Sequence, residues 1–219
     1  YIRRAEDYGI VDAAGKVDFA AVMRRVQTVI ETIEPHDSPE RFTSLGVECV
    51  SGAARLLSPY EVEVEGKRIT TESIVIASGA RPFIPSVPGL DGIDYLTSDN
   101  VWSLTELPPR LLVVGGGPIG CELAQAFSRL GSKVTQVDMA ERIMPREDAD
   151  VSAAVSTRFE AQGIEVLTSH RLQKFETVDG EHFMEAEHQG KTVRVAFDRV
   201  LLAIGRKANT EGFGLEEIG

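Results

Sequence analysis

The fold of this chain is decided by Leu111-Leu-Val-Val-Gly-Gly-Gly-Pro-Ile-Gly-Cys-Glu122, in which four apolar residues run into a glycine-rich turn. A helix with apolar residues at helical spacing follows, and Gly131 is typical of its stop. Where a buried strand turns into a helix, the first backbone N–H groups lack partners and carry partial positive charge, so they attract phosphate. Gly115, Gly117 and Gly120 allow the tight turn, the approach of a pyrophosphate and the close packing of helix on strand. The stretch therefore predicts a dinucleotide-binding site.

An acidic residue further along the chain fits the same site. Residues 133–137 form a second predicted strand, which ends at Asp138, and this fingerprint places an acceptor for the adenosine ribose about 20 residues after the glycines. A carboxylate accepts hydrogen bonds from a 2′-hydroxyl group and repels a 2′-phosphate. Glu141 adds negative charge and Arg142 is the one candidate cation nearby, so the sequence favours NADH over NADPH.

The pattern after Asp138 predicts the rest of an α/β domain. We expect a helix over 148–162, a strand over 164–167 and then three short strands with turns at Asp179-Gly180 and Gln189-Gly190. This is a Rossmann-like parallel sheet with a three-stranded β-meander. His170, His182 and His188 are expected at solvated strand positions, without the spacing of metal ligands.

The first hundred residues have a different organisation. Asp18 is expected to cap a helix whose apolar face runs from Phe19 to Ile33 and packs on a core. Strands are predicted over 47–50, 61–64 and 73–77, with a hairpin turn at Gly66-Lys67. The cysteines stand alone, Cys49 in a strand and Cys121 in the glycine-loop helix, and packing accounts for both.

Composition limits the partners and the location. The 219 residues are 42% apolar and carry a net charge of −11, which argues against a nucleic acid or an anionic membrane as partner. The sequence has neither an apolar run of transmembrane length nor a signal-peptide pattern. Two separate cysteines suit a reducing compartment, and we expect a cytoplasmic protein.

A near-repeat on either side of the glycine loop narrows the class of protein. Residues 74–82 read Ile-Val-Ile-Ala-Ser-Gly-Ala-Arg-Pro, and residues 200–206 read Val-Leu-Leu-Ala-Ile-Gly-Arg. With the glycine loop, residues 142–148 and residues 214–219, these strings resemble the FAD-dependent pyridine nucleotide-disulfide oxidoreductases. That family includes dihydrolipoamide dehydrogenase, glutathione reductase and mercuric reductase, and residues 35–47 look most like the mercuric-reductase-like branch.

The resemblance implies a domain layout and two cofactor sites. Residues 1–100 would be the later part of an FAD-binding domain, 101–206 an inserted NAD(P)H-binding domain and 207–219 a return toward the FAD domain. The residues implied to line NADH are Gly115, Gly116, Gly117, Pro118, Ile119, Gly120, Glu122, Asp138, Leu172 and Gly205. Those implied to line FAD are Ala54, Ser78, Gly79 and Ala80, and Glu122 matches the family acid near nicotinamide and flavin.

The resemblance also implies what the chain lacks. A redox-active cysteine pair would lie before Tyr1, and a dimerisation domain with a His-Glu pair would lie beyond Gly219. The chain would then be the central piece of a homodimeric enzyme that passes hydride from NADH to FAD and electrons on to a disulfide or small-molecule acceptor. We expect the piece alone to be inactive. A cysteine-independent flavoprotein NADH oxidase or reductase, and a non-catalytic dinucleotide-binding module, are the alternatives.

Overall fold

The computed structural model describes residue 2 and residues 5–219, which form a mixed α/β structure and confirm the predicted fold class. The chain divides into two compact units. Residues 1–27 and 84–204 make up the first unit, and residues 28–83 and 205–219 make up the second. The domain assignment made from the sequence stays a prediction, and the units are described one at a time.

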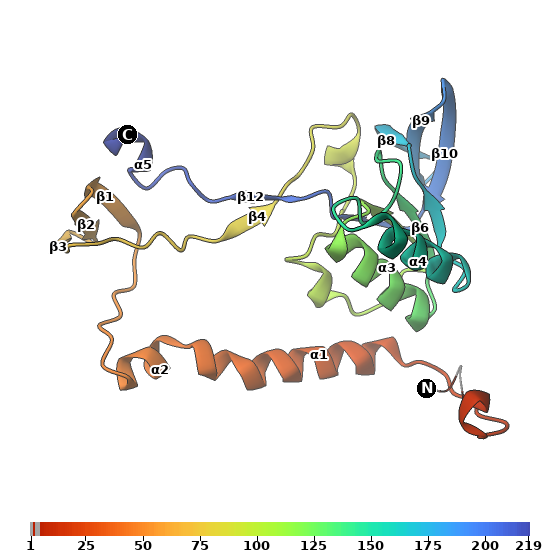
Figure 1. Cartoon of the computed structure of the whole chain (residues 1–219), viewed down its shortest axis with the longest axis horizontal. Helices are drawn as coiled ribbons and strands as arrows, with labels where there is room; N and C mark the ends of the chain where they lie inside the picture. The colour runs from red at the N-terminus through yellow and green to blue at the C-terminus, as the bar shows by residue number, and fades with distance from the viewer. Residues whose placement is uncertain (1, 3–4) are drawn as a thin grey trace. The chain divides into compact units, whose positions relative to one another are not determined.

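The first unit is built on a parallel sheet in the order β11-β5-β6-β7. The strands are β5 (Arg110–Val114), β6 (Lys133–Val137), β7 (Glu165–Leu167) and β11 (Arg199–Leu202). Crossover helices α3 (Pro118–Leu130) and α4 (Ala149–Glu160) connect them and lie side by side in Figure 1. Gly131 ends α3 with φ of 124°, as expected for the predicted stop.

Both faces of this sheet are covered, which explains the uninterrupted apolar run of β5. Leu111 and Val113 pack with the residues of α3 and α4. Leu112 and Val114 point the other way and pack with Phe175 and Met184 of a second sheet. Because side chains alternate across a strand, a strand that is buried on both faces is apolar at every position.

The second sheet is the predicted meander, formed by β8 (Arg171–Val178), β9 (Glu181–His188) and β10 (Lys191–Phe197). The turns fall at Asp179-Gly180 and Gln189-Gly190, where all four residues have φ between 50° and 82°, as two-residue hairpins require.

The prediction of solvated strand histidines is wrong for His170. This residue precedes β8, is 8% exposed, and stacks on His188 with ring centroids 4.2 Å apart. Its Nδ1 lies 2.6 Å from the Thr168 carbonyl oxygen, so the ring packs against its own loop and β9 rather than facing water. His182 and His188 lie in β9 and are half-buried.

Helix α1 (Phe19–Ile33) is capped as predicted, with Asp18 accepting a hydrogen bond from the Ala21 N–H at 2.9 Å. Only its first half fulfils the predicted core-facing role. Phe19 and Met23 are buried in the first unit, whereas Ile33 is 53% exposed. The short helices η3 (Glu34–Asp37) and α2 (Pro39–Ser44) follow, and the remaining 3₁₀ turns are η2 (Glu6–Tyr8), η4 (Leu90–Gly92) and η5 (Val101–Ser103).

The second unit contains a small antiparallel sheet and a two-stranded ribbon. The sheet consists of β1 (Ala54–Ser58), β2 (Glu61–Val64) and β3 (Lys67–Thr70), and the backbone of Leu56 bonds to Phe213, shortly before α5 (Leu215–Ile218). The ribbon pairs β4 (Ala80–Pro82) with β12 (Arg206–Ala208), which run side by side in Figure 1. The two near-repeats of the sequence, residues 74–82 and 200–206, thus each lead into one strand of this ribbon.

Several local predictions in the second unit are wrong. The hairpin turn is Glu65-Gly66 rather than Gly66-Lys67, because Val64 pairs with Lys67. Residues 47–50 and 73–77 are not strands; within the described residues they have no ladder partner, and Val75 is 89% exposed. Cys49 is therefore exposed in an extended segment, where its Sγ lies 3.6 Å from the Pro39 carbonyl oxygen, and it is not a packed strand residue.

Candidate functional site

The glycine loop joins the end of β5 to the start of α3, and two of its glycines are required by sterics. Gly115 has φ of 116°, and a Cβ there would lie 2.3 Å from the Ala203 carbonyl oxygen. A Cβ on Gly120 would lie 2.2 Å from the Gly115 carbonyl oxygen. Gly115 therefore allows the backbone after β11 to lie against the loop, and Gly120 allows the first turn of α3 to press against the end of β5.

The backbone of the first half of the loop is fully bonded within the protein. The Gly115 N–H donates to the Val137 carbonyl at 2.8 Å, and the Gly115 carbonyl accepts from Nε2 of Gln136 at 2.9 Å. The Gly116 N–H donates to Oδ2 of Asp138 at 2.5 Å, and its carbonyl accepts from the Met144 N–H at 2.6 Å. These bonds fix the direction in which the loop leaves the sheet.

The second half of the loop is different. Among the described residues, none accepts a hydrogen bond from the N–H groups of Gly117, Ile119 and Gly120. Pro118 has no N–H, and the next amide, that of Cys121, donates to the Gly117 carbonyl at 2.9 Å. Backbone N–H groups without such a partner at the positive end of a 13-residue helix attract anions.

Gly117 tests whether a phosphate fits there. Its φ of −77° is one that any residue adopts, and a Cβ would meet no protein atom within 4 Å. Neither the backbone nor the neighbouring side chains therefore require glycine at this position. The open space beside the free N–H groups is the cradle that a pyrophosphate pressed against the backbone would fill.

Asp138 lies where the sequence predicts it, half-buried just after β6. Besides the Gly116 N–H, its carboxylate accepts from the Ala140 N–H at 2.6 Å. Arg142, the nearby cation, donates instead to the carbonyl oxygens of Pro145 and Glu147, at 3.2 and 3.0 Å. The negative charge at the end of β6 therefore has no cation from Arg142 beside it.

Cys121 lies in α3, directly behind the loop, and is buried. Burial raises the pKa of the Cys121 thiol, so the group stays protonated. Its Sγ lies 3.4 Å from the Gly116 carbonyl oxygen and 3.6 Å from Nε2 of Gln136. This cysteine packs against the loop and has the environment of an inert thiol.

The other residues predicted to line a nicotinamide dinucleotide are spread over both units. Pro118, Ile119 and Glu122 are exposed on the first turns of α3, and Leu172 in β8 is half-buried against the core under the meander. Gly205 belongs to the second unit, where its carbonyl accepts from the Phe83 N–H at 2.9 Å. The structure brings together Gly115 to Glu122 and Asp138.

Three of the four residues predicted to line FAD meet at the ribbon of the second unit. Ser78 donates through Oγ to the Asn209 carbonyl at 2.5 Å, the Gly79 carbonyl accepts from the Asn209 N–H at 3.0 Å, and Ala80 pairs with Ala208. A Cβ on Gly79 would meet nothing within 4 Å. The fourth residue, Ala54, is not part of the ribbon; it is the first residue of β1, in the three-stranded sheet.

Two site residues were not predicted. Gln136 is completely buried and bonds the loop, and Asn209 bonds both Ser78 and, through Oδ1, Arg81 at 2.8 Å. A glutamine between Val134 and Val137 of a predicted strand was the available signal for the first. No pattern in the sequence indicates the second, because its partners lie about 130 residues earlier.

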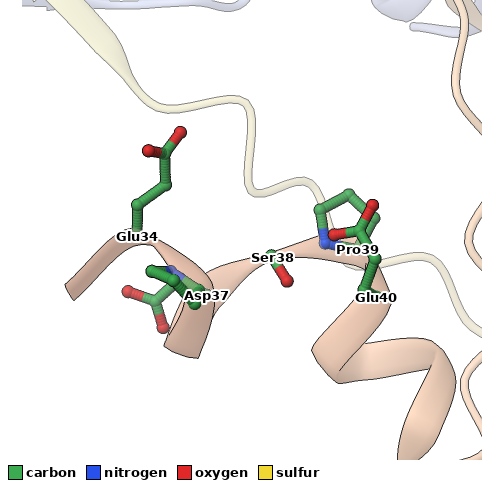
Figure 2. A pocket seen from close by; sticks show the side chains of 6 residues that line it. Glu34, Asp37, Ser38, Pro39 and Glu40 are labelled. Atoms are coloured by element: carbon green, nitrogen blue, oxygen red, sulfur yellow. The ribbon is translucent and has the colours of Figure 1, made fainter. Parts of the chain in front are cut away.

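A hollow at the turn between α1 and α2 is separate from the loop and is lined by Glu34, Pro35, Asp37, Ser38, Pro39 and Glu40. In Figure 2 its carboxylates point in different directions instead of converging. Within the described residues, no group of three or more His, Cys, Asp or Glu side chains could hold a metal ion. None of the described helices is long and apolar enough to span a bilayer.

Comparisons with known proteins agree on one family. The pyridine nucleotide-disulphide oxidoreductase family matches residues 14–219. The mercuric reductase of Staphylococcus aureus is 32% identical over 96% of this chain and 39% of its own length. A dihydrolipoyl dehydrogenase of Bacillus subtilis is 36% identical over the whole chain and 48% of its own length.

A solved structure extends the likeness to the fold. The HOCl-induced flavoprotein disulfide reductase RclA from Escherichia coli superposes with a TM-score of 0.79 at 26% identity, over 99% of this chain and 48% of that one. The chain thus spans less than half the length of these relatives. With a glycine loop of this geometry and a family match over nearly all its length, the chain belongs to the pyridine nucleotide-disulphide oxidoreductase family.

Proposed function

We propose that this chain is the central part of a flavoprotein that transfers hydride from NADH to FAD and, in the full-length enzyme, passes the electrons on to a disulfide or thiol-bound acceptor. The observation that carries the proposal is the pattern of backbone bonds in the glycine loop. The N–H groups of Gly115 and Gly116 are bonded, whereas those of Gly117, Ile119 and Gly120 have no acceptor in the part of the chain that the structure describes, and the space beside Gly117 is open. An NADH pyrophosphate needs donors in that arrangement.

The residues in the first unit would hold the two ends of NADH differently. The three free N–H groups would bind the pyrophosphate, and Asp138 would accept hydrogen bonds from the adenosine ribose. Glu122, exposed on α3 one turn after Pro118, is proposed to lie toward the nicotinamide. Leu172 is a proposed further contact of the dinucleotide, and the role of Gly205, which belongs to the second unit, stays a prediction.

The ribbon of the second unit would contribute to the seat of the flavin. Gly79 has φ of 71° and open space beside it, so a ligand can approach its backbone closely. Asn209 bonds to Ser78 and to the Gly79 carbonyl and holds both in place. When bound, FAD supplies the two-electron chemistry, and the protein's part is to bind, orient and exclude water.

The charge at the end of β6 supports NADH rather than NADPH as the donor. Asp138 would repel a 2′-phosphate, and Arg142 is engaged by two carbonyl groups. In a calorimetric titration we expect NADH to bind at least about tenfold more tightly than NADPH, a difference of about 1.4 kcal/mol. Equal affinity for the two dinucleotides would refute this assignment.

The unpaired cysteines suit a reducing compartment, and we place the enzyme in the cytoplasm.

The proposed function is tested on the full-length protein under anaerobic conditions. We expect the purified protein to contain bound flavin and the visible absorption band of that flavin to bleach on addition of NADH. Subsequent addition of a disulfide acceptor should restore the band. A full-length protein that contains no flavin, or whose flavin NADH does not reduce, would contradict the proposal.

A further inference from the structure

The buried side chain of Gln136 is not accounted for by the fold. It lies near the end of β6 with no exposed surface, in a strand that also buries Val134, Val137 and the hydroxyl residue Thr135. Burying an amide in an apolar core costs free energy unless it is hydrogen-bonded, and an apolar residue of similar size would fill the same volume. The bonds of Gln136 therefore indicate what it does.

Gln136 and Asp138 hold opposite ends of one peptide group. Nε2 of Gln136 donates to the Gly115 carbonyl at 2.9 Å, and Oδ2 of Asp138 accepts from the Gly116 N–H at 2.5 Å. The carbonyl of residue 115 and the N–H of residue 116 belong to the same peptide plane. Gln136 in β6 and Asp138 directly after it are two positions apart, so their side chains leave the chain on the same face.

This peptide group stands between two glycines, which have no Cβ to restrict rotation about the flanking bonds. The next peptide group, Gly116–Gly117, also stands between two glycines, and its carbonyl is held by the Met144 N–H at 2.6 Å. If the Gly115–Gly116 peptide turned over, a carbonyl oxygen would stand where an N–H group stood, and the chain leading to Gly117 would change direction. Hydrogen bonds from outside the loop must therefore select its orientation.

We infer that Gln136 is a positioning residue for the dinucleotide: together with Asp138 it fixes the Gly115–Gly116 peptide, and thereby aims the free N–H groups of Gly117, Ile119 and Gly120 at the pyrophosphate. The inference rests on the proposed function of the loop. The buried amide of Gln136 would then raise the affinity for the dinucleotide, in addition to any contribution that it makes to the stability of the fold.

The test is a titration of the 219-residue chain and its variants with NADH and with ADP-ribose, which keeps the pyrophosphate and lacks the nicotinamide. Gln136→Met preserves the length of the side chain and removes the donor. We expect the Kd of this variant to rise about tenfold for both ligands, because a buried carbonyl loses its partner and the loop loses its orientation.

A matched control removes a buried hydrogen bond at the opposite end of the same helix–strand unit. Ser132 donates through Oγ to the Pro108 carbonyl at 2.7 Å and is buried. Ser132→Ala is expected to lower the melting temperature and to leave both Kd values unchanged. If Gln136→Met lowers the melting temperature but binds both ligands as tightly as the wild type, its role is merely structural and the inference is wrong.

A second variant tests the inference through the pH dependence of ligand affinity, which a purely structural role of Gln136 would not change. In Gln136→Glu only the protonated carboxyl group can donate to the Gly115 carbonyl, and burial raises the pKa of such a group. The affinity of this variant for ADP-ribose should increase as the pH falls from about 8 to about 5. The affinity of the wild type should stay constant over the same pH range. A pH profile that is the same for both proteins contradicts the inference. A wild-type chain that binds neither ligand overturns the proposed function and this inference with it.

Discussion

At the scale of single residues, the three glycines of the fingerprint do three different things. Gly115 and Gly120 are required because protein backbone lies about 2.2 to 2.3 Å from where a Cβ would be. Gly117 has open space, so the requirement there comes from the proposed ligand. The sequence pattern alone does not distinguish these roles, because the neighbours of each glycine are set by tertiary packing.

A stability measurement separates the steric glycines from an ordinary one. In Gly120→Ala the new Cβ meets the backbone oxygen of Gly115, which cannot move aside, and we expect a loss of about 1–3 kcal/mol. Gly92, whose Cβ would meet nothing and whose φ is not positive, provides the control. Urea unfolding should show little change for Gly92→Ala. Equal stability of Gly120→Ala and the wild type would show that the loop is not packed as described.

Sequence reasoning located the glycine loop and the position of Asp138 but not Gln136. The loop is a local pattern whose spacing reflects its own geometry. Gln136 acts on Gly115, 21 residues earlier, and that contact exists only once β6 has paired with β5. In such domains, a polar residue in a predicted buried strand therefore indicates a candidate hydrogen bond to a neighbouring loop.

At the scale of elements, the predictions succeeded where a strand or helix carries its own signal and failed where it depends on a partner. Residues 111–114 are apolar at every position, residues 133–137 begin shortly after a glycine that ends a helix, and the glycine turns of the meander fix its hairpins. Residues 47–50 and 73–77 have β-branched residues in the same way, yet within the described residues no strand pairs with them. A sequence shows that a segment suits a sheet and does not show whether a neighbouring strand is present.

One element junction should make stability depend on pH. Arg110 at the start of β5 binds Asp198, between β10 and β11, through Nη2 to Oδ1 at 2.6 Å and through its backbone N–H to Oδ2 at 2.8 Å. These bonds hold the pKa of Asp198 below its ordinary value. A group with a lowered pKa in the folded state stabilises the protein above its unfolded pKa, and that contribution is lost as the pH falls below about 4.

We therefore expect Asp198→Asn to lower the free energy of unfolding by about 1 kcal/mol at pH 7, since a third of each side chain remains in solvent, and by less at pH 3. Urea unfolding at the two pH values measures the difference. Asp94→Asn provides the control, because the Asp94 side chain is 83% exposed in its ion pair with Arg199. This variant should change the free energy of unfolding little at either pH. An Asp198→Asn variant whose deficit is the same at both pH values would contradict the assignment.

At the scale of the whole molecule, the chain covers less than half of the mercuric reductase, the dihydrolipoyl dehydrogenase and the flavoprotein disulfide reductase named above. The residues proposed to seat FAD are few and exposed, apart from the half-buried Ala80. We expect the 219-residue chain, purified alone, to bind NADH weakly and to contain no stoichiometric flavin. An absorption spectrum of the purified chain measures the flavin directly, and a full flavin band would show that this chain is sufficient to hold FAD.

The central claim is that the free N–H groups at the start of α3 hold the NADH pyrophosphate, and Gly117→Ala tests it most directly. The added Cβ meets no protein atom, so the melting temperature should not change, whereas it would occupy the space of the phosphate. A calorimetric titration of both proteins with NADH should show a Kd at least about tenfold higher for the variant. An unchanged Kd in a variant of unchanged stability would contradict the account.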